Sequence, residues 1–543
     1  MKPADRQIGY NALVARYGLL CVEDRTSSFI AKRVSTVRRT EHADGSVILR
    51  YPVQYDFEDT LADHLEFCLK YEGVNLQILA ALFEQHGYEE IQAWLNRKPG
   101  SRYARVCGHL YEWLTGKQFD YRLPRGIDAV PVLDDDIYFT APAQRNRRFS
   151  ILHNLPGTPS FCPLVRRTPA LKGWIKKDLG GKIAKELSAL EPELLERAVN
   201  YLYLAETRSS FAIEKEIPDS QKAERFRRLL ERAGEDTPLE EMTFVEWRNL
   251  IMPRLRAEMS YRPTQNWLSR SGRSELRAEY IPPAPTDVSS MMEGVIYVGE
   301  LVKSNEYPVV LAAATAAFGF VFVHPFFDGN GRMHRFLLHH LLRLGGFTPP
   351  GAVVPVSAAM EREIARYSEV LKAYSAPLTA KLDYRFDPDA DLIEVKTQPR
   401  YLYAFFDATE LCEFTFQCLE STIDHDLSSE LAYLRAYDSA HRALSRWLEA
   451  PQPELEKLIR YIAQNDGHLS KNKRGQFPLM NDEVIARAEA QIREAFSAYW
   501  TSPHSEKAAH VPADAPPPLT PHTPPGAPPA RPRPGPRPRS RRP

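Results

Sequence analysis

The longest apolar run of this 543-residue chain, Val309 to Val323, limits the possible folds more than any other segment. Only Thr315 interrupts the run, and a helix that spans a membrane needs about twenty apolar residues, which is more than the run contains. We therefore expect a helix buried in a protein core, with Pro308 suited to its first turn. From about residue 186, apolar side chains recur three and four positions apart, which predicts a series of helices before and after this run.

Composition divides the rest of the chain. Hydrophobic residues make up 43% and charged residues 26% of the sequence, values typical of globular proteins. Residues 1–130 combine a β-hairpin that turns at Asp44-Gly45 with helical stretches, which predicts an α/β region. Residues 131–185 are rich in turns, among them Leu179-Gly-Gly-Lys, and are expected to form a connector. Residues 386–501 have helical patterns and are expected to form a carboxy-terminal region. Residues 502–543 are a tail rich in proline and arginine.

Charge and cysteine usage exclude several classes of protein. Basic and acidic residues number 70 each, but residues 502–543 hold Lys507 and six arginines against only Glu506 and Asp514. This tail has few large apolar side chains, so we expect it to be disordered. The cysteines form no Cys-x-x-Cys pair, so neither a disulfide framework nor a zinc knuckle is indicated. The amino terminus lacks a secretory apolar core, which predicts a soluble, cytoplasmic protein without a membrane partner.

A dense group of functional side chains follows the apolar run. His324 comes first, Asp328 stands before a Gly329-Asn330-Gly331 turn, and Arg332 and Arg335 begin a second predicted helix. Backbone N–H groups at a helix start bind anions, and two glycines let a phosphate chain approach closely. Arginines at a helix N-terminus oppose the helix dipole, which also indicates an anionic ligand.

The other polar side chains suggest how such an anion is used. Asp328 would repel a phosphate unless its carboxylate shares Mg²⁺ with the phosphate oxygens. His324, with an ordinary pKa near neutrality, is then left as a general base. Alone, a Gly-Asn-Gly turn or a single histidine usually has a structural role, but the combination is far more specific. No GxxxxGK[ST] motif is present, which excludes a P-loop nucleotide site.

The stretch HPFFDGNGRMHR, residues 324–335, resembles the signature HxFx[DE]GNGRxxR of the Fic family, whose members mostly transfer AMP from ATP to a protein hydroxyl. The resemblance implies a mainly α protein, with a Fic-fold helical bundle and a β-hairpin flap over residues 186–385. It further implies that His324 deprotonates the acceptor hydroxyl, that Asp328 binds Mg²⁺ and that Phe326 anchors the loop. Gly329, Asn330 and Gly331 would cradle the α- and β-phosphates. Arg332 would stabilise the departing pyrophosphate, and Arg335 would hold the γ-phosphate.

A second resemblance lies upstream. Ser210-Phe-Ala-Ile-Glu214-Lys215 is similar to the family's inhibitory helix motif [ST]xxxE[GN], with Lys215 in place of glycine or asparagine. The resemblance implies that Glu214 pairs with Arg335, keeps it from the γ-phosphate and blocks productive ATP binding. Such an inhibitory helix acts within its own chain or across a homodimer.

The segment from Tyr261 to Pro285 resembles the flap hairpin of the family, with YRPTQNWL and YIPPAP as its ends and a turn expected at Ser271-Gly272. An exposed strand there pairs with an extended segment of a target protein through main-chain hydrogen bonds. The acceptor hydroxyl would then lie near His324.

These observations predict a protein adenylyltransferase that uses ATP and Mg²⁺ to modify a Tyr, Thr or Ser hydroxyl of a target protein. Three alternatives stay open. The pocket could transfer another nucleotide, or remove AMP if Glu214 positions a water. The protein could instead be a non-catalytic nucleotide sensor that recruits a partner, or nucleic acid through its basic tail. The intact His324 favours catalysis over sensing.

Overall fold

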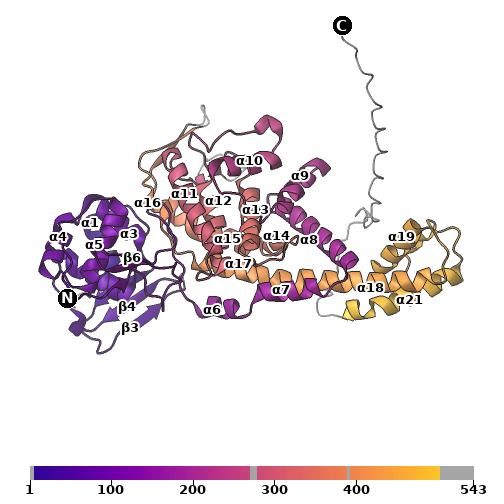
Figure 1. Ribbon diagram of the computed structural model, residues 1–543, viewed down its shortest axis with the longest axis horizontal. Helices are drawn as coiled ribbons and strands as arrows, with labels where there is room; N and C mark the ends of the chain where they lie inside the picture. The colour runs from indigo at the N-terminus through magenta and orange to yellow at the C-terminus, as the bar shows by residue number, and fades with distance from the viewer. Residues whose placement is uncertain (1–4, 44, 270–277, 388–391, 502–543) are drawn as a thin grey trace, which may run out of the picture. The chain divides into compact units, whose positions relative to one another are not determined.

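The computed structural model describes residues 5–43, 45–269, 278–387 and 392–501. The chain divides into two compact units, one that ends at Ser428 and one that begins at Ser429. Helices predominate in both units, as Figure 1 shows, and short strands occur in the first. The prediction of a mainly α-helical protein is therefore confirmed.

The first unit opens with an α/β region. Its four-stranded sheet has the order β1-β2-β4-β3, with β2 and β4 parallel and the other pairs antiparallel. The antiparallel β3–β4 pair is the predicted hairpin, although Asp44 of its turn lies outside the described residues. The elements are β1 (Arg6–Ile8), α1 (Tyr10–Tyr17), β2 (Thr26–Ile30), β3 (Arg38–Glu41), β4 (Val47–Tyr51), a 3-10 turn (Val53–Tyr55), α2 (Leu61–Phe67), a π-helical turn (Cys68–Glu72), α3 (Leu76–Gln85), α4 (Tyr88–Arg97) and α5 (Arg102–Thr115).

The predicted connector contains regular structure. β5 (Val130–Pro131), β6 (Gln144–Asn146) and β7 (Ile151–His153) form a sheet of order β5-β7-β6, and α6 (Pro169–Lys176) and α7 (Leu179–Ser188) follow. The expectation that Leu179-Gly-Gly-Lys breaks helical structure is wrong, because these residues form the first turn of α7. Asp178 caps that turn by accepting a hydrogen bond from Gly181 N at 3.1 Å.

The helices that carry the predicted site surround α12, which spans Val309–Val323. Nearly every α12 side chain is buried, and α11, α13 and α17 pack against it. The apolar run is thus the core helix that its length predicts. The helices are α8 (Pro192–Ile213), α9 (Ser220–Glu231), α10 (Glu241–Ile251), α11 (Pro285–Glu300), α13 (Asn330–Leu344), α14 (Val356–Arg362), α15 (Ile364–Thr379), α16 (Tyr401–Ala404) and α17 (Thr409–Ser421), with shorter turns at Arg254–Arg256, Leu301–Lys303 and Thr422–Leu427.

Two short hairpins accompany this bundle. β8 (Leu268–Ser269) pairs antiparallel with β9 (Ala278–Tyr280), which agrees with a hairpin in the flap segment, but the expected Ser271-Gly272 turn lies outside the described residues. β10 (Tyr384–Asp387) pairs antiparallel with β11 (Leu392–Val395). The Trp267 ring meets the edge of Phe386, with ring centroids 5.4 Å apart, so the two hairpins are in contact.

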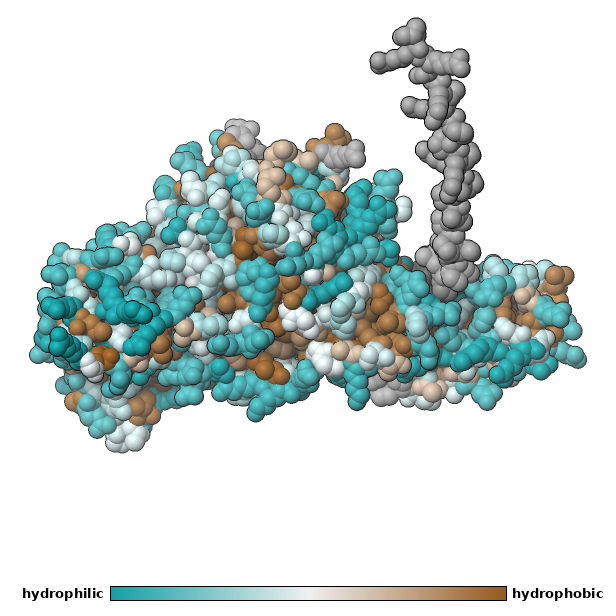
Figure 2. Space-filling model, in the orientation of Figure 1, coloured by the Kyte–Doolittle hydropathy of each residue, from teal (hydrophilic) through white to brown (hydrophobic). Residues whose placement is uncertain are grey.

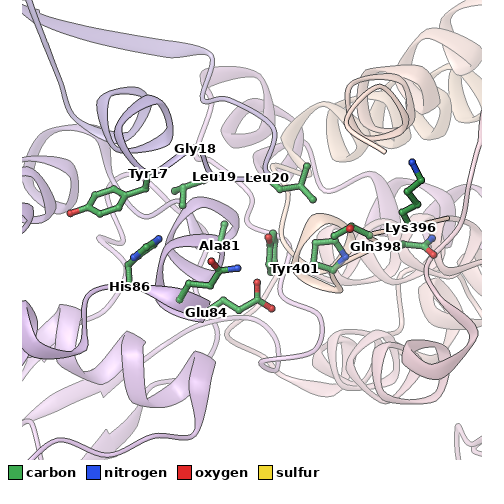
Figure 3. A pocket seen from close by; sticks show the side chains of 13 residues that line it. Tyr17, Gly18, Leu19, Leu20, Ala81, Glu84, His86, Lys396, Gln398 and Tyr401 are labelled. Carbon is green, nitrogen blue, oxygen red and sulfur yellow. The ribbon is translucent and has the colours of Figure 1, made fainter. Parts of the chain in front are cut away.

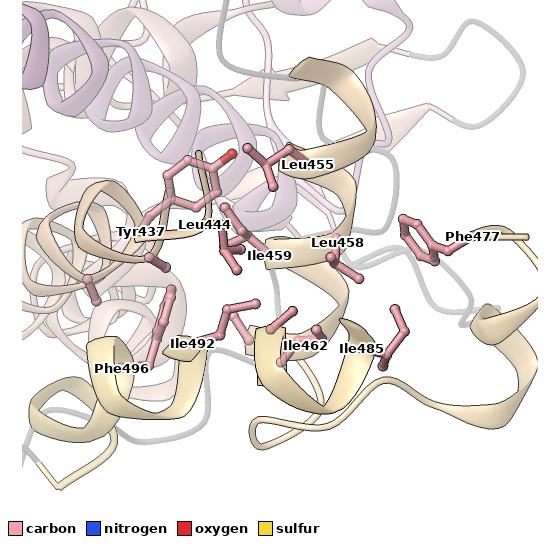
Figure 4. Packing of buried hydrophobic residues seen from close by; sticks show 14 of the residues in the cluster. Tyr437, Leu444, Leu455, Leu458, Ile459, Ile462, Phe477, Ile485, Ile492 and Phe496 are labelled. Carbon is pink, nitrogen blue, oxygen red and sulfur yellow. The ribbon is translucent and has the colours of Figure 1, made fainter. Parts of the chain in front are cut away.

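The second unit is helical, with α18 (Ser428–Ser445), α19 (Gln452–Ala463), α20 (Lys471–Arg474) and α21 (Asp482–Thr501). Figure 4 shows its core, in which Leu458 and Ile462 of α19 face Ile485 and Ile492 of α21. Asn481 caps α21 by accepting a hydrogen bond from Val484 N at 2.8 Å.

The division at Ser428 differs from the domain boundaries that composition suggests. The first unit includes residues 1–130, 131–185 and 186–385 together. The connector packs on the core helix, because the ring of Phe161 fills the space beside Gly319 of α12. The predicted helical region 386–501 is split, because α17 packs on α12 while α18 to α21 form their own core. Apolar patterns locate helices, but they do not show which helices share a core.

Within the ranges described above, no helix combines the length and the apolar composition that a membrane crossing requires. The face seen in Figure 2 is mainly hydrophilic, and its apolar residues form small, scattered groups.

Candidate active site

His324 ends α12 in the left-handed conformation, with φ 51°. Its ring is half-buried, and Nδ1 lies 3.2 Å from the carbonyl oxygen of Val321. A carbonyl only accepts hydrogen bonds, so Nδ1 carries the proton of the neutral ring and Nε2 keeps a lone pair. Burial lowers the pKa of His324 to about 4. The ring is therefore fully neutral at pH 7, whereas an ordinary histidine pKa would leave part of it protonated.

Phe326 and Asn330 hold the loop between α12 and α13. The Phe326 side chain is buried against Tyr261 and Phe320, which agrees with its predicted anchoring role. Asn330 Nδ2 donates to Phe326 O at 2.7 Å, and Phe326 N donates to Asn330 Oδ1 at 3.1 Å. The loop uses both ends of this amide, so Asn330 shapes the turn with its side chain and leaves its backbone N–H for an anion.

The first turn of α13 is open to an anion. The helix begins at Asn330, whereas sequence analysis expects it to begin near Arg332, two residues later. No side chain caps this helix start. Gly329, with φ 88°, makes the turn that L side chains rarely adopt. Gly331 lies inside the first turn, among backbone N–H groups that have no helical partner. These groups and the helix dipole favour an anion at this helix start.

The carboxylate of Glu214 occupies this site. Glu214 follows α8 directly, and its Oε1 lies 2.5 Å from where a Cβ at Gly331 would be. Arg335, whose side chain is buried, donates from Nη2 to Glu214 Oε1 at 2.6 Å and from Nε to Ser210 Oγ at 2.7 Å. Arg332 Nε lies 3.1 Å from Glu214 Oε2. The predicted Glu214–Arg335 pair is present, and Arg332 joins it.

Lys215 occupies the position where the resembling motif has glycine or asparagine. It adopts φ 56°, the left-handed conformation in which those two residues are common. Two hydrogen bonds close the end of α8 around it, from Lys215 N to Ala212 O at 2.9 Å and from Glu216 N to Phe211 O at 3.1 Å. This is the Schellman pattern. The helix therefore ends as the motif requires, despite the substituted residue.

Asp328 fits a magnesium ligand. Its carboxylate is partly exposed at the edge of the anion site, with Oδ2 3.0 Å from Arg256 Nη1 and Oδ1 3.9 Å from Arg332 Nη2. Proteins commonly hold Mg²⁺ through one or two carboxylates and leave its other positions to phosphate and water. One accessible carboxylate beside an anion site matches that donor set.

Arg262 supports the loop, and sequence analysis did not single it out. Its buried guanidinium donates from Nε to His324 O at 2.9 Å and from Nη2 to Pro283 O at 2.5 Å, while its backbone N donates to Pro325 O at 2.8 Å. Burial lowers the pKa of Arg262 to about 10. The side chain ties both ends of the flap segment to the residue that would act as base. The only sequence feature that could have pointed to Arg262 is its place in YRPTQNWL, one end of the predicted flap.

A second buried polar contact joins α8 to the helices behind the site. Glu206, one turn before Ser210, places Oε1 2.9 Å from His339 Nε2 of α13 and accepts hydrogen bonds from Ser357 N and Oγ of α14, at 3.0 and 2.5 Å. Burial raises the pKa of Glu206, but His339 and Ser357 outweigh burial and bring it below its usual value. Sequence analysis gave neither Glu206 nor His339 a role.

A cavity of about 450 Å³ lies away from this site, between α1, α3 and residues 396–401. Figure 3 shows Tyr17, His86 and Glu84 on one side and Lys396 and Tyr401 on another. It contains none of the predicted site residues, so the candidate site is defined by the α12–α13 loop rather than by this hollow.

Comparison with known proteins places the same segment in a family. Residues 238–342 match the Fic/DOC family model. "Protein adenylyltransferase Fic" from Drosophila mojavensis is 39% identical over 70 residues, which is 13% of this chain and 14% of the relative. The protein of the same name from Nematostella vectensis is 35% identical over 93 residues, 16% of this chain and 19% of the relative. Residues 238–342 are thus similar to Fic/DOC domains, and the chain spans less than a fifth of the length of these relatives.

Two solved structures are also similar. A Fic family protein from Desulfovibrio desulfuricans G20 has a TM-score of 0.34 and 18% identity, over 62% of this chain and 86% of that one. A Fic domain containing signaling protein from Bacteroides thetaiotaomicron has a TM-score of 0.35 and 15% identity, over 49% of this chain and 96% of that one.

Proposed function

We propose that this protein is a protein adenylyltransferase that Glu214 holds in an inhibited state. One observation carries the proposal. His324, with a lone pair on Nε2, directly precedes the loop into an uncapped helix N-terminus, where Arg332 and Arg335 converge on a carboxylate. A carboxylate bound there stands in for the phosphates of a nucleotide, because both are anions that accept from N–H groups. The names of the relatives support adenylyl transfer as the reaction.

The residues of the loop divide the chemistry between them. The acceptor hydroxyl oxygen bonds to the α-phosphorus of ATP, the bond from that phosphorus to the bridging oxygen of the β-phosphate breaks, and pyrophosphate leaves. His324 Nε2 accepts the hydroxyl proton. Backbone N–H groups of the first turn of α13 and Arg332 stabilise the charge that grows on the leaving group. Mg²⁺, held by Asp328, would neutralise charge on the phosphates.

Glu214 inhibits this reaction by competing for the same donors. Its two carboxylate oxygens lie against Arg335 and Arg332, so a γ-phosphate has to displace it before Arg335 can bind the nucleotide. The contact with Gly331 also fills the space that a phosphate chain needs. In the described state the carboxylate and a fully seated triphosphate exclude each other.

Transfer of label from ATP tests the proposal. The full-length protein and Glu214→Gly are incubated with Mg²⁺ and cell lysate, using ATP labelled in the α-phosphate in one arm and in the γ-phosphate in the other. We expect the Glu214→Gly variant to label proteins from the α-labelled nucleotide only, and the unaltered protein to do so weakly. Glu214→Gly combined with His324→Ala is the matched control and should transfer nothing.

Other results would overturn the assignment. Label from the γ-phosphate would indicate phosphoryl transfer. Label from another α-labelled nucleoside triphosphate, but not from ATP, would indicate a different substrate. Loss of AMP from modified proteins in the presence of the unaltered chain would indicate removal of AMP. Transfer by neither variant, together with intact ATP binding, would favour a nucleotide sensor.

A further inference from the structure

The second unit carries a compact basic surface around one aromatic ring. Lys457, Arg460 and Tyr461 lie on one face of α19, since they are three and four positions apart. The Lys457 and Arg460 cations each lie 5.8 Å from the centre of the Tyr461 ring, and Lys473 of α20 lies 4.7 Å from it. We call these four residues the Tyr461 surface.

The core of the unit fixes this surface in place. Tyr461 OH donates to Gln476 Oε1 at 3.2 Å, and its ring meets Phe477 edge-on, with centroids 6.2 Å apart. Phe477 is fully buried and lies beside Leu458 of α19 in Figure 4. All four residues of the surface are half-buried. Their cations are therefore positioned by packing, whereas the long side chains of an open surface are free to move apart.

Among the described residues, the two lysines of this surface make no ion pair of their own. Within the part of the chain that the structure describes, Lys457 and Lys473 pair with no carboxylate. Arg474 and Arg493 of the same unit do, with Asp482 at 2.8 Å and Glu489 at 3.6 Å. A cation–π contact occurs about once in 70–80 residues of a typical protein, so three cations around one ring are far more than usual. Like charges held together repel one another, and an anion bound between them removes that repulsion.

We propose that the Tyr461 surface binds the phosphate backbone of nucleic acid without sequence preference. A polynucleotide supplies phosphates at short, regular intervals, so neighbouring phosphates can meet the separate cations around the ring. An aromatic ring among cations also offers a base an apolar contact. Further along the sequence stand Lys507 and six arginines between positions 531 and 542, so the chain carries more basic residues after α21. Nothing in this proposal depends on adenylyl transfer.

Fluorescence anisotropy with the full-length protein tests the proposal. The probes are fluorescein-labelled 24-nucleotide DNA of arbitrary sequence, single- and double-stranded, at 50 and 200 mM salt. We expect binding that weakens steeply with salt. Lys457→Gln with Lys473→Gln should weaken it about tenfold at 50 mM salt and reduce the slope of log affinity against log salt by about 2. Arg442→Gln with Arg446→Gln removes the same charge at the end of α18 and should change affinity less than twofold.

Four results would overturn the proposal. These are no binding at 50 mM salt, equal losses in the two double variants, an unchanged affinity in the lysine variant, and binding to phosphatidylserine vesicles or poly-glutamate but not to DNA. A full-length variant with the six tail arginines changed to glutamine separates the two basic elements. It should keep the dependence on Lys457 and Lys473, and its complete loss of binding would assign the site to the tail.

Discussion

Glu214 and Gly331 pack so closely that a methyl group at position 331 would lie 2.5 Å from the Glu214 carboxylate. The glycine that lets a phosphate chain approach the helix start is therefore the same glycine that lets the inhibitory carboxylate approach. Arg335 is shared in the same way, since it donates to Glu214 at 2.6 Å. In the proposed function, inhibitor and substrate would use one set of donors, so each contact that favours one would oppose the other.

Removal of this carboxylate should increase nucleotide affinity. Hydrogen bonds to charged groups contribute about 1.5–3 kcal/mol, so Glu214→Gln should bind ATP about tenfold more tightly or better, measured by calorimetry. Glu216→Gln is the matched control, because Glu216 lies 3.7 Å from Arg332 and does not touch Arg335. Equal gains in the two variants would show that net charge, and not the Glu214 contact, limits binding.

The fall of kcat/KM on the acid side of its pH profile should occur at unusually low pH. A general base must be unprotonated, and burial lowers the pKa of His324 to about 4, so its base form persists until the pH falls towards that value. In the Glu214→Gly background, kcat/KM should stay nearly constant from pH 8 to pH 5.5 and fall below pH 5. A midpoint near pH 6.5 would show that the ring titrates as an exposed histidine.

Protonation of the same ring also predicts a loss of stability in acid. The unfolded chain binds this proton below about pH 6.5, whereas the folded chain binds it only near pH 4. The free energy of unfolding should therefore fall as the pH decreases through this window. His324→Gln should fall less steeply in urea titrations at pH 7 and pH 5. Parallel losses in the two proteins would contradict the assignment.

The Glu206 contact should hold the inhibitory helix in place. Glu206→Ala leaves the buried donors of Ser357 without an acceptor, at a cost of about 1–3 kcal/mol for each unsatisfied group, so this variant should unfold at lower urea concentration. Glu206→Gln keeps an acceptor for Ser357 and should lose less. Both variants should show raised basal transfer although Glu214 is intact, because α8 is less firmly seated. Destabilisation without any rise in transfer would limit Glu206 to a purely structural role.

Lys215 should be replaceable with a gain in stability. A left-handed conformation costs a residue with a Cβ about 1–2 kcal/mol, while glycine loses about 0.5–1 kcal/mol more backbone entropy on folding. Lys215→Gly should therefore stabilise the protein by about 0.5–1 kcal/mol in urea titrations. It should also lower basal transfer, since the end of α8 becomes firmer. Lys215→Ala keeps the Cβ and should give neither effect.

Local sequence features predicted much of the site, because the residues between His324 and Arg335 are close in sequence and a helix start fixes their geometry. The apolar run also predicted α12 nearly to the residue. The Glu214–Arg335 contact came only from resemblance, since nothing in the chain shows that α8 and α13 pack together. Arg262 and Glu206 were missed for a related reason. Their partners are carbonyls, a serine and a histidine that are distant in sequence, and polar groups of this kind leave no periodic pattern.

The last turn of α8 is the end of a 22-residue helix whose earlier turns bury Ala198, Leu202 and Tyr203 in the bundle. Removal of the whole helix would expose that apolar surface and disrupt the packing of the bundle. If Glu214 inhibits as proposed, its release would therefore be a local event, such as the rotation of one side chain or the fraying of the last turn. An activator of the proposed enzyme would then need to bind only the few residues around Lys215.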